Sequence, residues 1–293
     1  MKKITVFTPS FNRAYLLPRL YKSLCQQTNQ DFVWLVVDDG STDNTKQLIE
    51  SWQKENIIEI QYHYKENGGM HTAHNLAYSI ISTELNVCID SDDCMPINAI
   101  ELILNKWDTS TKKDKIAGII GLDADINNNI IGTKIPKDLK KGNLIDLYKK
   151  YNVKGDKKMI LRTEVVRKFP FYPEFLNEKL VPLGILYRQI GNQYDFIYSN
   201  EVYCIVEYQT EGSSASILKQ YKQSPRGFAY ARVVEKKLSN VFIENCKSSI
   251  HLISSALFAN DFSLLNSGPK VYLNYLLFPF GWILNKWIKN RIN

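Results

Sequence analysis

The first hundred residues alternate short apolar runs with helical segments, and this alternation limits the fold more than any other feature of the chain. The runs at 4–10, 32–37, 57–64 and 85–89 are typical of β-strands. "FVWLVV" at 32–37 is apolar throughout, as expected of a strand that is buried on both faces of a parallel sheet. The order β-α-β-α-β-α-β predicts an α/β fold with a Rossmann-like, mostly parallel sheet flanked by helices.

Length and charge set further bounds. The chain has 293 residues, of which 44% are apolar, enough for a sizeable core. The formal net charge of +7 is unevenly distributed, because residues 216–293 hold eleven Lys and Arg against three Asp and Glu, while the rest of the chain holds 26 against 27. A near-neutral body with a basic, aromatic tail indicates an anionic surface as partner.

The cysteine pattern and the N-terminus argue against secretion. The five cysteines form no C-x-x-C pair and are odd in number, which indicates neither a zinc site nor a disulfide framework. The N-terminal segment reaches Pro9 too early to contain a signal-peptide core. We therefore predict a reduced, cytoplasmic setting.

Three polar clusters follow three of the predicted strands. They are "TPSFNR" at 8–13, "DDGSTD" at 38–43 and "DSDD" at 90–93. Loops at the carboxyl ends of parallel strands meet at one edge of the sheet, where ligands bind in doubly wound folds. One such cluster is ordinary turn chemistry. Three at successive strand ends predict a ligand site.

The motifs narrow the ligand. The chain has no G-x-G-x-x-G in the first turn and no G-x-x-x-x-G-K-[ST], so dinucleotide and P-loop sites are excluded. Asp90, Asp92 and Asp93 lie within four residues and repel one another. A divalent cation such as Mg²⁺ or Mn²⁺, which readily bridges to a diphosphate, would offset that repulsion. The alternative is that one aspartate caps the helix near Pro96 and the others are solvated.

Taken together, "VFTPSFNRAYLLPRLYKSLCQQT", "FVWLVVDDGSTDNT", "ENGGMHTAHNLA" and "CIDSDD" resemble the family 2 glycosyltransferases with the A-type fold. The resemblance covers about residues 1–110, which would form the nucleotide-sugar-binding half. "KGDKKMILRTEVVRKFPF" and "NEKLVP" resemble more loosely a bacterial polysaccharide-assembly subgroup, so residues 111–215 would form the acceptor-side half of the same domain. Residues 216–293 are expected to form a helical, amphipathic extension.

The resemblance implies a role for each matching position. Asp92 would contact the ribose and diphosphate, Asp92 and Asp93 would ligate Mn²⁺ or Mg²⁺, and Asp90 opens the D-x-D pattern. Asp39 would hydrogen-bond the nucleobase. His71 and Arg13 have ordinary structural alternatives, as a helix-start residue and a solvated turn residue. The remaining expected donor contacts are Thr8, Pro9, Asn12, Arg13, Asp38, Asn67, Gly68, Gly69, His71 and Asn75.

Such enzymes invert the anomeric carbon in one displacement and need a carboxylate to take the proton of the acceptor hydroxyl. The similar subgroup carries a glutamate where this chain has Leu183, and leucine cannot accept a proton. Three alternatives follow: Glu178 or Asp156 supplies the base, the register of this comparison with the subgroup is shifted, or the chain is impaired in transfer. Met70 and Thr72 also stand where the subgroup often has basic residues, which weakens the expected diphosphate contacts.

The C-terminal segment combines aromatic and basic side chains. Its apolar stretch 271–284 has 14 residues, fewer than the roughly 20 that span a bilayer. Tryptophans and tyrosines beside lysines are typical of a segment that lies on a membrane surface. The alternative is that this segment packs on the protein itself or on a second copy.

The sequence therefore predicts an inverting, metal-dependent glycosyltransferase. It would move a sugar from a nucleotide diphosphate sugar to a glycan or lipid-linked acceptor in bacterial surface polysaccharide synthesis, and the resemblance implies a UDP-linked donor. It would lie on the inner face of the cell membrane. It would bind no nucleic acid, because the charges of the tail are sparse and its aromatic residues stand in an apolar run without interleaved Arg and Lys. The alternatives are a sugar-nucleotide pyrophosphorylase, whose basic Gly-rich signature is missing, and a non-catalytic nucleotide-sugar-binding or scaffold protein.

Overall fold

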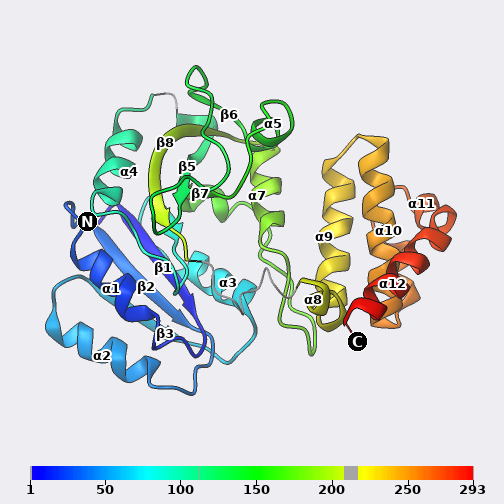
Figure 1. Ribbon diagram of the computed structural model, residues 1–293, viewed down its shortest axis with the longest axis horizontal. Helices are drawn as coiled ribbons and strands as arrows, with labels where there is room; N and C mark the ends of the chain where they lie inside the picture. Colours follow the sequence, from blue (N-terminus) through cyan, green and yellow to red (C-terminus); the bar gives the residue numbers. More distant parts are fainter. Residues whose placement is uncertain (1, 112, 208–216, 293) are drawn as a thin grey trace. The chain divides into compact units, whose positions relative to one another are not determined.

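The computed structural model describes residues 2–111, 113–207 and 217–292 (Figure 1). The chain divides into two compact units. The sheet unit comprises Met1–Phe171 and Ile190–Gln209, and the helical unit comprises Tyr172–Gln189 and Thr210–Asn293. The predicted boundaries differ at one point, because residues 172–189 belong with the C-terminal helices and not with the sheet.

An eight-stranded sheet forms the centre of the sheet unit, as the strand and helix alternation predicts. Its spatial order is β3-β2-β1-β4-β7-β5-β8-β6. The strands are β1 (Ile4–Ser10), β2 (Phe32–Asp38), β3 (Ile60–Tyr64), β4 (Leu85–Cys88), β5 (Ile116–Ala124), β6 (Lys141–Asn143), β7 (Lys157–Arg162) and β8 (Asp195–Ile205).

The four strands of the first hundred residues pair in parallel, as the sequence pattern predicts, and the strands that follow make the complete sheet mixed. The pairs β1–β2, β1–β4, β2–β3 and β5–β8 are parallel. Strand β7 runs antiparallel to both of its neighbours, β4 and β5, and β6 runs antiparallel to β8. Beyond β5, the chain turns at 125–129 and returns to form an isolated antiparallel bridge between Ala124 and Ile130.

Helices cover both faces of the sheet (Figure 1). On one face, Tyr21 of α1 stacks on Trp52 of α2 at 4.2 Å between ring centroids, and on Trp34 of β2 at 6.0 Å. On the other face, Phe7 meets His74 of α3 edge to face at 5.0 Å. The helices of the sheet unit are α1 (Leu17–Cys25), α2 (Thr45–Glu55), α3 (Met70–Ile80), α4 (Ala99–Asp108), α5 (Leu144–Lys149) and α6 (Thr163–Val166).

The strand directions bring several chain segments to one edge of the sheet. The carboxyl ends of β1, β2 and β4 meet there because these strands are parallel. Since β7 runs the opposite way, its first residues reach the same edge, beside the carboxyl ends of β5 and β8. The edge is therefore built from six strands and not from the first three alone. We call it the carboxyl edge.

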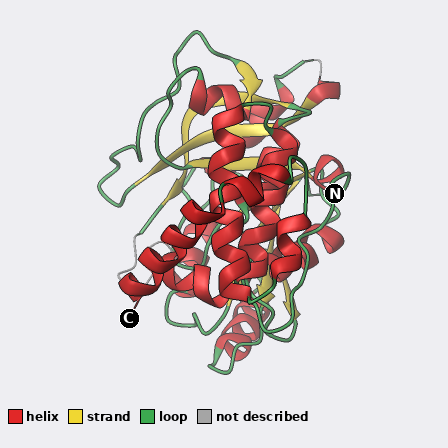
Figure 2. Ribbon diagram, turned by 90° about the vertical axis from the view of Figure 1, so that its right-hand side faces the viewer, coloured by secondary structure: helices red, strands yellow, loops and turns green. Residues whose placement is uncertain are grey.

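The described residues 217–292 contain helices, drawn in red in Figure 2, and no strand. Within this unit α10 packs against both α9 and α12. Helix α7 (Gly184–Gly191) begins in the helical unit and ends in the sheet unit. The others are α8 (Ile217–Gln223), α9 (Pro225–Leu238), α10 (Phe242–Ala259), α11 (Tyr272–Leu276) and α12 (Phe278–Ile292).

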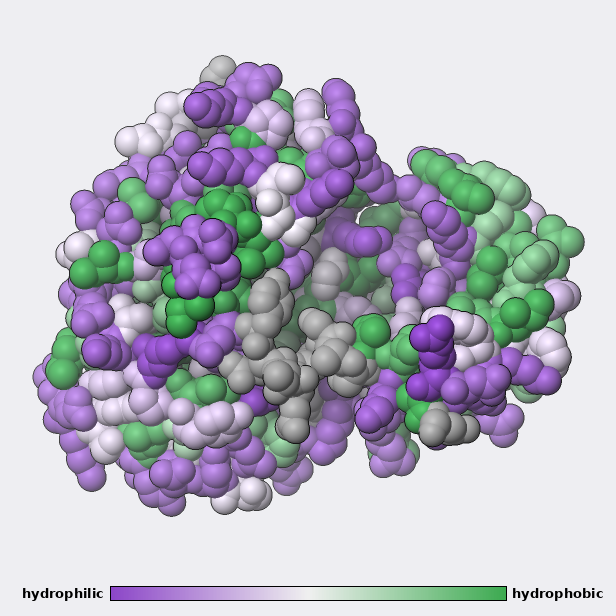
Figure 3. Space-filling model, in the orientation of Figure 1, coloured by the Kyte–Doolittle hydropathy of each residue, from purple (hydrophilic) through white to green (hydrophobic). Residues whose placement is uncertain are grey.

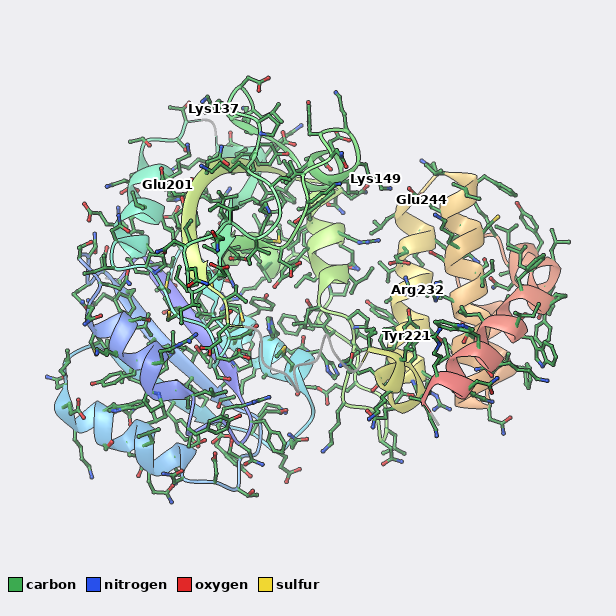
Figure 4. All side chains as sticks on the ribbon, in the orientation of Figure 1. Lys137, Lys149, Glu201, Tyr221, Arg232 and Glu244 are labelled. Carbon is green, nitrogen blue, oxygen red and sulfur yellow. The ribbon has the colours of Figure 1, made fainter. Side chains whose placement is uncertain are left out.

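The interior of the helical unit is unusually polar. Arg232 donates to Glu235 at 2.8 Å and to Tyr221 at 2.6 Å, and Figure 4 shows the Tyr221 and Arg232 side chains together. The buried Lys236 ammonium donates to Asn274 Oδ1 at 2.8 Å, and burial lowers its pKa to about 8. Further buried polar side chains of the unit are Asn245, Ser248, Ser249, Ser254, Ser255 and Asn285.

Candidate active site

Asp38 ends β2 and Asp39 follows it, and both carboxylates accept hydrogen bonds inside the protein. Asp39 Oδ1 accepts from Lys65 Nζ at 2.7 Å and from the Gly68 amide at 3.0 Å. Asp39 Oδ2 accepts from the Gly69 amide at 2.8 Å and from Asn67 Nδ2 at 3.2 Å. A carboxylate offers about four lone-pair sites, so the 65–69 loop uses all of them. The hydrogen bond from Asp39 to a nucleobase stays a prediction, and a base would have to displace one of these donors.

Asp38 also supports the loops. Its Oδ1 accepts from the Ser41 amide at 2.7 Å and its Oδ2 from the Tyr62 hydroxyl at 2.7 Å. The pKa of the Tyr62 hydroxyl is raised, mainly because it is desolvated and next because it donates a hydrogen bond to Asp38. Both aspartates thus fix the shape of the β2 and β3 loops.

The first loop is tied to the second through Asn12. Its Oδ1 accepts from the Thr42 amide at 2.8 Å, and its own amide donates to Ser41 Oγ at 2.9 Å. The loop turns here, because Asn12 has φ of 53°, a left-handed conformation that asparagine tolerates. Thr8 was expected beside the nucleobase, but it is fully buried and its hydroxyl accepts from the Trp34 indole at 3.0 Å. Pro9 is likewise buried within β1.

The loop before α3 lies beside the β2 loop. Asn67 Nδ2 donates to the Asp39 carbonyl at 2.7 Å, and Gly69 has φ of 95°, which favours glycine at the start of the helix. His71 is 2% exposed, while Asn75 is half-buried on the next turn. The predicted donor loop is thus positioned by Asp39, and the side chain of His71 lies inside the protein.

The three aspartates after β4 separate into different environments. Asp90 and Asp92 are half-buried, whereas Asp93 is buried. Desolvation and the neighbouring Asp90 charge raise the pKa of Asp92, so these two carboxylates influence each other. Arg19 of α1 donates to the Asp92 carbonyl at 2.5 Å and holds this loop against the first helix. We call Asp90 and Asp92 the outer pair.

Asp93 points into the protein, contrary to its expected role as a metal ligand. Its Oδ2 accepts from Cys204 Sγ at 3.4 Å and its Oδ1 from the Glu207 amide at 3.3 Å. Desolvation raises its pKa to about 7, against the opposing effect of Lys158. Asp93 is therefore engaged with β8, and the outer pair remains for a cation.

A further carboxylate and a lysine at this edge give no signal in the sequence. Asp123 ends β5, is 3% exposed, and its Oδ1 has no hydrogen-bond partner among the described residues. Lys158 of β7 lies 4.0 Å from Asp93 Oδ2. The sequence around Asp123 indicates only the end of a strand, and the sequence around Lys158 only the start of one. The hydrophobic periodicity does not show that β7 runs in the opposite direction, which is what brings Lys158 to this edge. We call Asp93 and Asp123 the inner pair.

The described residues hold no group of three or more His, Cys, Asp or Glu side chains arranged to bind a metal ion. The outer pair nevertheless fits the usual Mg²⁺ or Mn²⁺ arrangement, in which one or two carboxylates act together with the oxygens of a substrate phosphate. A protein-only metal site is thus missing from this part of the chain, but a shared one is compatible with its donor set.

Glu178, a candidate base, instead caps a helix. It is buried, and its two oxygens accept from the Arg226 amide at 3.0 Å and the Gly227 amide at 2.9 Å, at the start of α9. These amides have no partner within their helix, and a carboxylate at a helix N-terminus is stabilised by both the hydrogen bonds and the helix dipole. Glu178 is thus buried, and both of its oxygens are engaged at the start of α9.

Replacing Glu178 by alanine is expected to lower the free energy of unfolding of the helical unit by about 2–3 kcal/mol, because two buried amides lose their acceptor. Guanidinium unfolding followed by circular dichroism measures this. The exposed Glu174 provides the matched control, and Glu174→Ala should change stability by less than about 0.5 kcal/mol. Equal effects of the two substitutions would refute the capping role.

Asp156 is exposed just before β7. Its charge contributes, after desolvation, to raising the pKa of Tyr148 to about 12, and it also acts on Asp123. It thus lies near the inner pair at the carboxyl edge. Leu183, at the position where the resembling subgroup has glutamate, is half-buried, and its carbonyl accepts from the Tyr172 hydroxyl at 2.8 Å.

A cavity of about 530 Å³ lies elsewhere in the sheet unit, between α4, β8 and the segment before β6. Its lining includes Lys106, Lys137, Lys140 and Glu201, and Figure 4 labels Lys137 and Glu201 there. None of the site residues predicted from the sequence lines it. No local pattern in the sequence indicates this cavity, because its walls come from separate segments.

Known proteins share both the sequence pattern and the fold. The sequence model of Glycosyl transferase family 2 matches residues 5–169, more than half of the chain. An uncharacterized glycosyltransferase of Nostoc is 31% identical over 108 residues, 37% of this chain and 34% of the relative. The teichoic acid poly(glycerol phosphate) polymerase of Staphylococcus epidermidis is 31% identical over 111 residues, 38% of this chain and 15% of the polymerase. The chain thus matches about a third or less of the length of these relatives.

Solved structures extend the likeness in fold to most of the chain. S. aureus TarS 1–349 in complex with UDP-GlcNAc has a TM-score of 0.62 at 20% identity, covering 88% of this chain and 72% of TarS 1–349. The mannosyltransferase PcManGT from Pyrobaculum calidifontis, in complex with GDP-Man and Mn²⁺, has a TM-score of 0.53 at 16% identity, covering 97% of this chain and 87% of that protein. The α/β fold with C-terminal helices that the sequence predicts is confirmed, and the match over residues 5–169 shows that the chain belongs to glycosyl transferase family 2.

Proposed function

We propose that this chain transfers a sugar, with inversion, from a UDP-sugar to a glycan or lipid-linked acceptor in bacterial surface polysaccharide synthesis. The observation that carries this proposal is the convergence of the β1, β2 and β4 loops, with the outer pair, at one edge of a family 2 domain. The UDP-GlcNAc complex of TarS and the polymerase relative support the donor and the acceptor class.

The donor would lie across the loops that Asp39 and Asn12 hold in place. Ser10 Oγ, at the end of β1, is buried and has no hydrogen-bond partner among the described residues, so it is available to a ligand. The 65–69 loop and the outer pair would face the ribose and diphosphate. Met70 and Thr72 supply no positive charge here, whereas the charges of Arg13 and Arg19 both act on Asp92.

We further propose that Mn²⁺ or Mg²⁺ is held by the outer pair together with the donor diphosphate. When bound, such an ion stabilises the negative charge of the leaving diphosphate. The protein contributes the position of the two carboxylates, which the Arg19 hydrogen bond to the Asp92 carbonyl fixes. The Mn²⁺ in the PcManGT complex supports a divalent ion at this kind of site.

We assign the base to Asp156. Both oxygens of Glu178 accept hydrogen bonds from backbone amides, so neither is left to take the proton of the acceptor hydroxyl. Asp156 is exposed at the carboxyl edge, where an acceptor hydroxyl would approach, and would take its proton as the oxygen attacks the anomeric carbon.

A second candidate function is nucleotide-sugar binding without transfer, and Leu183 is the observation that favours it. A panel of UDP-sugars, measured for UDP release with and without Mn²⁺, separates the two. Metal-dependent release of UDP supports the transferase, whereas binding without release supports the binding protein. If no member of the panel binds, the nucleotide-sugar proposal itself is wrong.

We also propose that the helical unit lies on an anionic membrane surface. Among the described helices, none is both long and apolar enough to cross a membrane. Leu276, Phe280, Ile283 and Trp287 follow one another at helical spacing, and their exposed fractions are 69%, 58%, 57% and 47%. We call them the outer stripe. Figure 3 shows hydrophobic side chains, in green, gathered over these C-terminal helices.

The opposite side of α12 explains why the outer stripe is left exposed. Gly281, Asn285 and Ile288 are buried, and Asn285 Nδ2 donates to the Ser254 carbonyl of α10 at 3.1 Å. A Cβ on Gly281 would lie 2.4 Å from Ile253 Cβ, so the two helices pack closely. Small and polar residues inside with large apolar residues outside are the arrangement of helices that contact lipid. The expected alternative, packing on the protein itself, accounts for the inner side only.

Replacing both Phe280 and Trp287 by serine is expected to weaken binding to vesicles of phosphatidylcholine and phosphatidylserine by at least about tenfold, because two large apolar side chains no longer enter the interface. Lys286, whose ammonium lies 4.0 Å from the Trp282 ring centre, and Lys289 would add salt-sensitive attraction. Vesicle sedimentation measures both effects. If the variant sediments with vesicles as the parent does, the membrane proposal is wrong. If, in addition, the parent is a dimer and the variant a monomer, the outer stripe binds a second copy of the chain.

A further inference from the structure

The cavity between α4 and β8 is closed by a chain segment that is anchored to β8 at two points. Asn200 of β8 forms two hydrogen bonds with the backbone of Ile135, its Oδ1 accepting from the amide and its Nδ2 donating to the carbonyl, both at 2.8 Å. The Tyr198 amide donates to the Lys140 carbonyl at 2.8 Å. The anchors are two residues apart on β8 but five apart on the other segment, so residues 136–139 arch outward. We call the hollow of about 530 Å³ beside them the arch cavity.

Strand β8 lines the arch cavity where its register is irregular. One residue of β5, Gly121, lies opposite three residues of β8, 199–201. Such an irregularity redirects side chains and is common beside functional sites. Gly121 has no room for a side chain, because a Cβ would lie 2.1 Å from the ring of Tyr203, whose hydroxyl donates to Ser199 Oγ at 3.0 Å. Packing beneath the cavity therefore fixes the shape of this wall.

The described lining of the arch cavity is basic. Lys106, Lys137 and Lys140 contribute to it, against one acidic side chain, Glu201. The Lys140 ammonium donates to the Lys137 carbonyl at 2.9 Å, which uses one of its three N–H groups. Among the described residues, none of the three ammonium groups forms an ion pair, so their charges are available to a ligand. An anion is therefore the ligand that this cavity attracts.

The other lining residues favour an anion that also carries hydroxyl groups. Asn105, Thr109 and Glu201 offer hydrogen-bond donors and acceptors beside the lysines. The volume lies within the roughly 300–1,000 Å³ of small-molecule sites. Among the described lining residues the one aromatic side chain, Tyr198, is 3% exposed, and its hydroxyl donates to the Asn143 carbonyl at 2.8 Å. It thus offers no face on which a nucleobase could stack, which disfavours a nucleic acid.

We propose that the arch cavity binds a segment of an anionic glycan, a hydroxyl-rich chain that carries phosphate or carboxylate groups. Its described lining shares no residue with the loops proposed to hold the donor. Along β8, Glu201 lies three residues, about 10 Å, before Cys204, whose thiol donates to Asp93 at the carboxyl edge. The cavity therefore holds a part of the acceptor chain that does not itself react. This role rests on the proposed function, whereas the binding of an anionic glycan does not.

The experiment titrates the full chain by calorimetry, without UDP or metal, with four oligomers of equal length. They are a glycerol phosphate oligomer, an oligogalacturonate, a neutral maltooligosaccharide and a single-stranded DNA. The parent should bind one or both of the anionic glycans at least about tenfold more tightly than the neutral glycan and the DNA. The tighter of the two identifies the anionic group as phosphate or carboxylate.

Four variants locate the binding. Lys106→Met/Lys137→Met should weaken binding of the anionic glycan at least about tenfold, because two charges are lost, and Lys106→Arg/Lys137→Arg should match the parent. Lys22→Met/Lys54→Met removes the same charge from exposed positions on α1 and α2 and should have no effect. Asn105→Trp fills the cavity from α4 without a change of charge and should weaken binding as strongly as the loss of the two lysines.

Equal binding of the anionic and neutral glycans by the parent would overturn the proposal, and so would DNA binding as tight as that of the anionic glycan. An equal loss in Lys22→Met/Lys54→Met would also overturn it, because attraction to a basic surface would then suffice. Should Lys106→Met/Lys137→Met fail to fold by circular dichroism, Asn105→Trp and the preference of the parent decide. UDP binding is measured separately. A parent that binds no UDP contradicts the proposed function, while the titrations without UDP still test the arch cavity.

Discussion

Replacing Asp92 by asparagine is expected to lower kcat/KM for sugar transfer by about 10³-fold and to remove the effect of Mn²⁺ on UDP affinity. Asp92 is one of only two carboxylates of the described D-x-D segment that remain outward, since Asp93 is engaged by Cys204 and Glu207. Asparagine keeps the size of the side chain but not its charge. Calorimetric titration with UDP, with and without Mn²⁺, and initial rates of UDP release measure the two effects.

The control for this prediction is Asp114→Asn, at an exposed position outside the carboxyl edge. It should leave both quantities unchanged. Circular dichroism should show that Asp92→Asn retains the fold, because the backbone carbonyl of Asp92, and not its carboxylate, holds Arg19. An Asp92→Asn protein that responds to Mn²⁺ like the parent would show the metal assignment to be wrong.

The second large effect is expected for Asp156. Asp156→Asn should reduce the rate of transfer by about 10²–10⁴-fold, because general-base assistance to the acceptor hydroxyl is lost, and should leave the Kd for UDP unchanged. Single-turnover transfer to an acceptor and UDP calorimetry separate these quantities. The substitution keeps the shape of the side chain, and the exposure of Asp156 makes a folding defect unexpected.

Asp138→Asn, at another exposed aspartate of the sheet unit, is the matched control and should transfer at the parent rate. Transfer at the parent rate by Asp156→Asn as well would remove Asp156 as the base. If UDP release coupled to transfer continues when Asp156 and Glu178 are both replaced, the inner pair becomes the next candidate for the base.

Much of the first half was predictable from the sequence because its signals are local. The apolar run 32–37 and the turn residues that follow it predict strand β2 and its loop, and the structure places both as expected. Family membership followed from the same clusters. What these local signals did not contain is the direction in which the aspartates point, because side-chain direction depends on neighbours that are distant in the sequence.

Glu178 and Asp93 illustrate the limit. Each is a carboxylate with a plausible chemical role in a motif, yet each faces inward, Glu178 to the start of α9 and Asp93 to β8. A helix start lies 47 residues downstream of Glu178, and Cys204 lies 111 residues from Asp93. No pattern within a short window encodes such partners.

The sequence by itself determined the alternation of strands and helices, the polar loops after β1, β2 and β4, and the apolar, basic character of the C-terminal segment, because each depends on residue type and local spacing. The tertiary structure alone decided that β7 runs against its neighbours and delivers Lys158 to the acidic cluster. Strand direction is set by packing across the whole sheet, and the charge balance of a buried cluster exists only once its strands have come together.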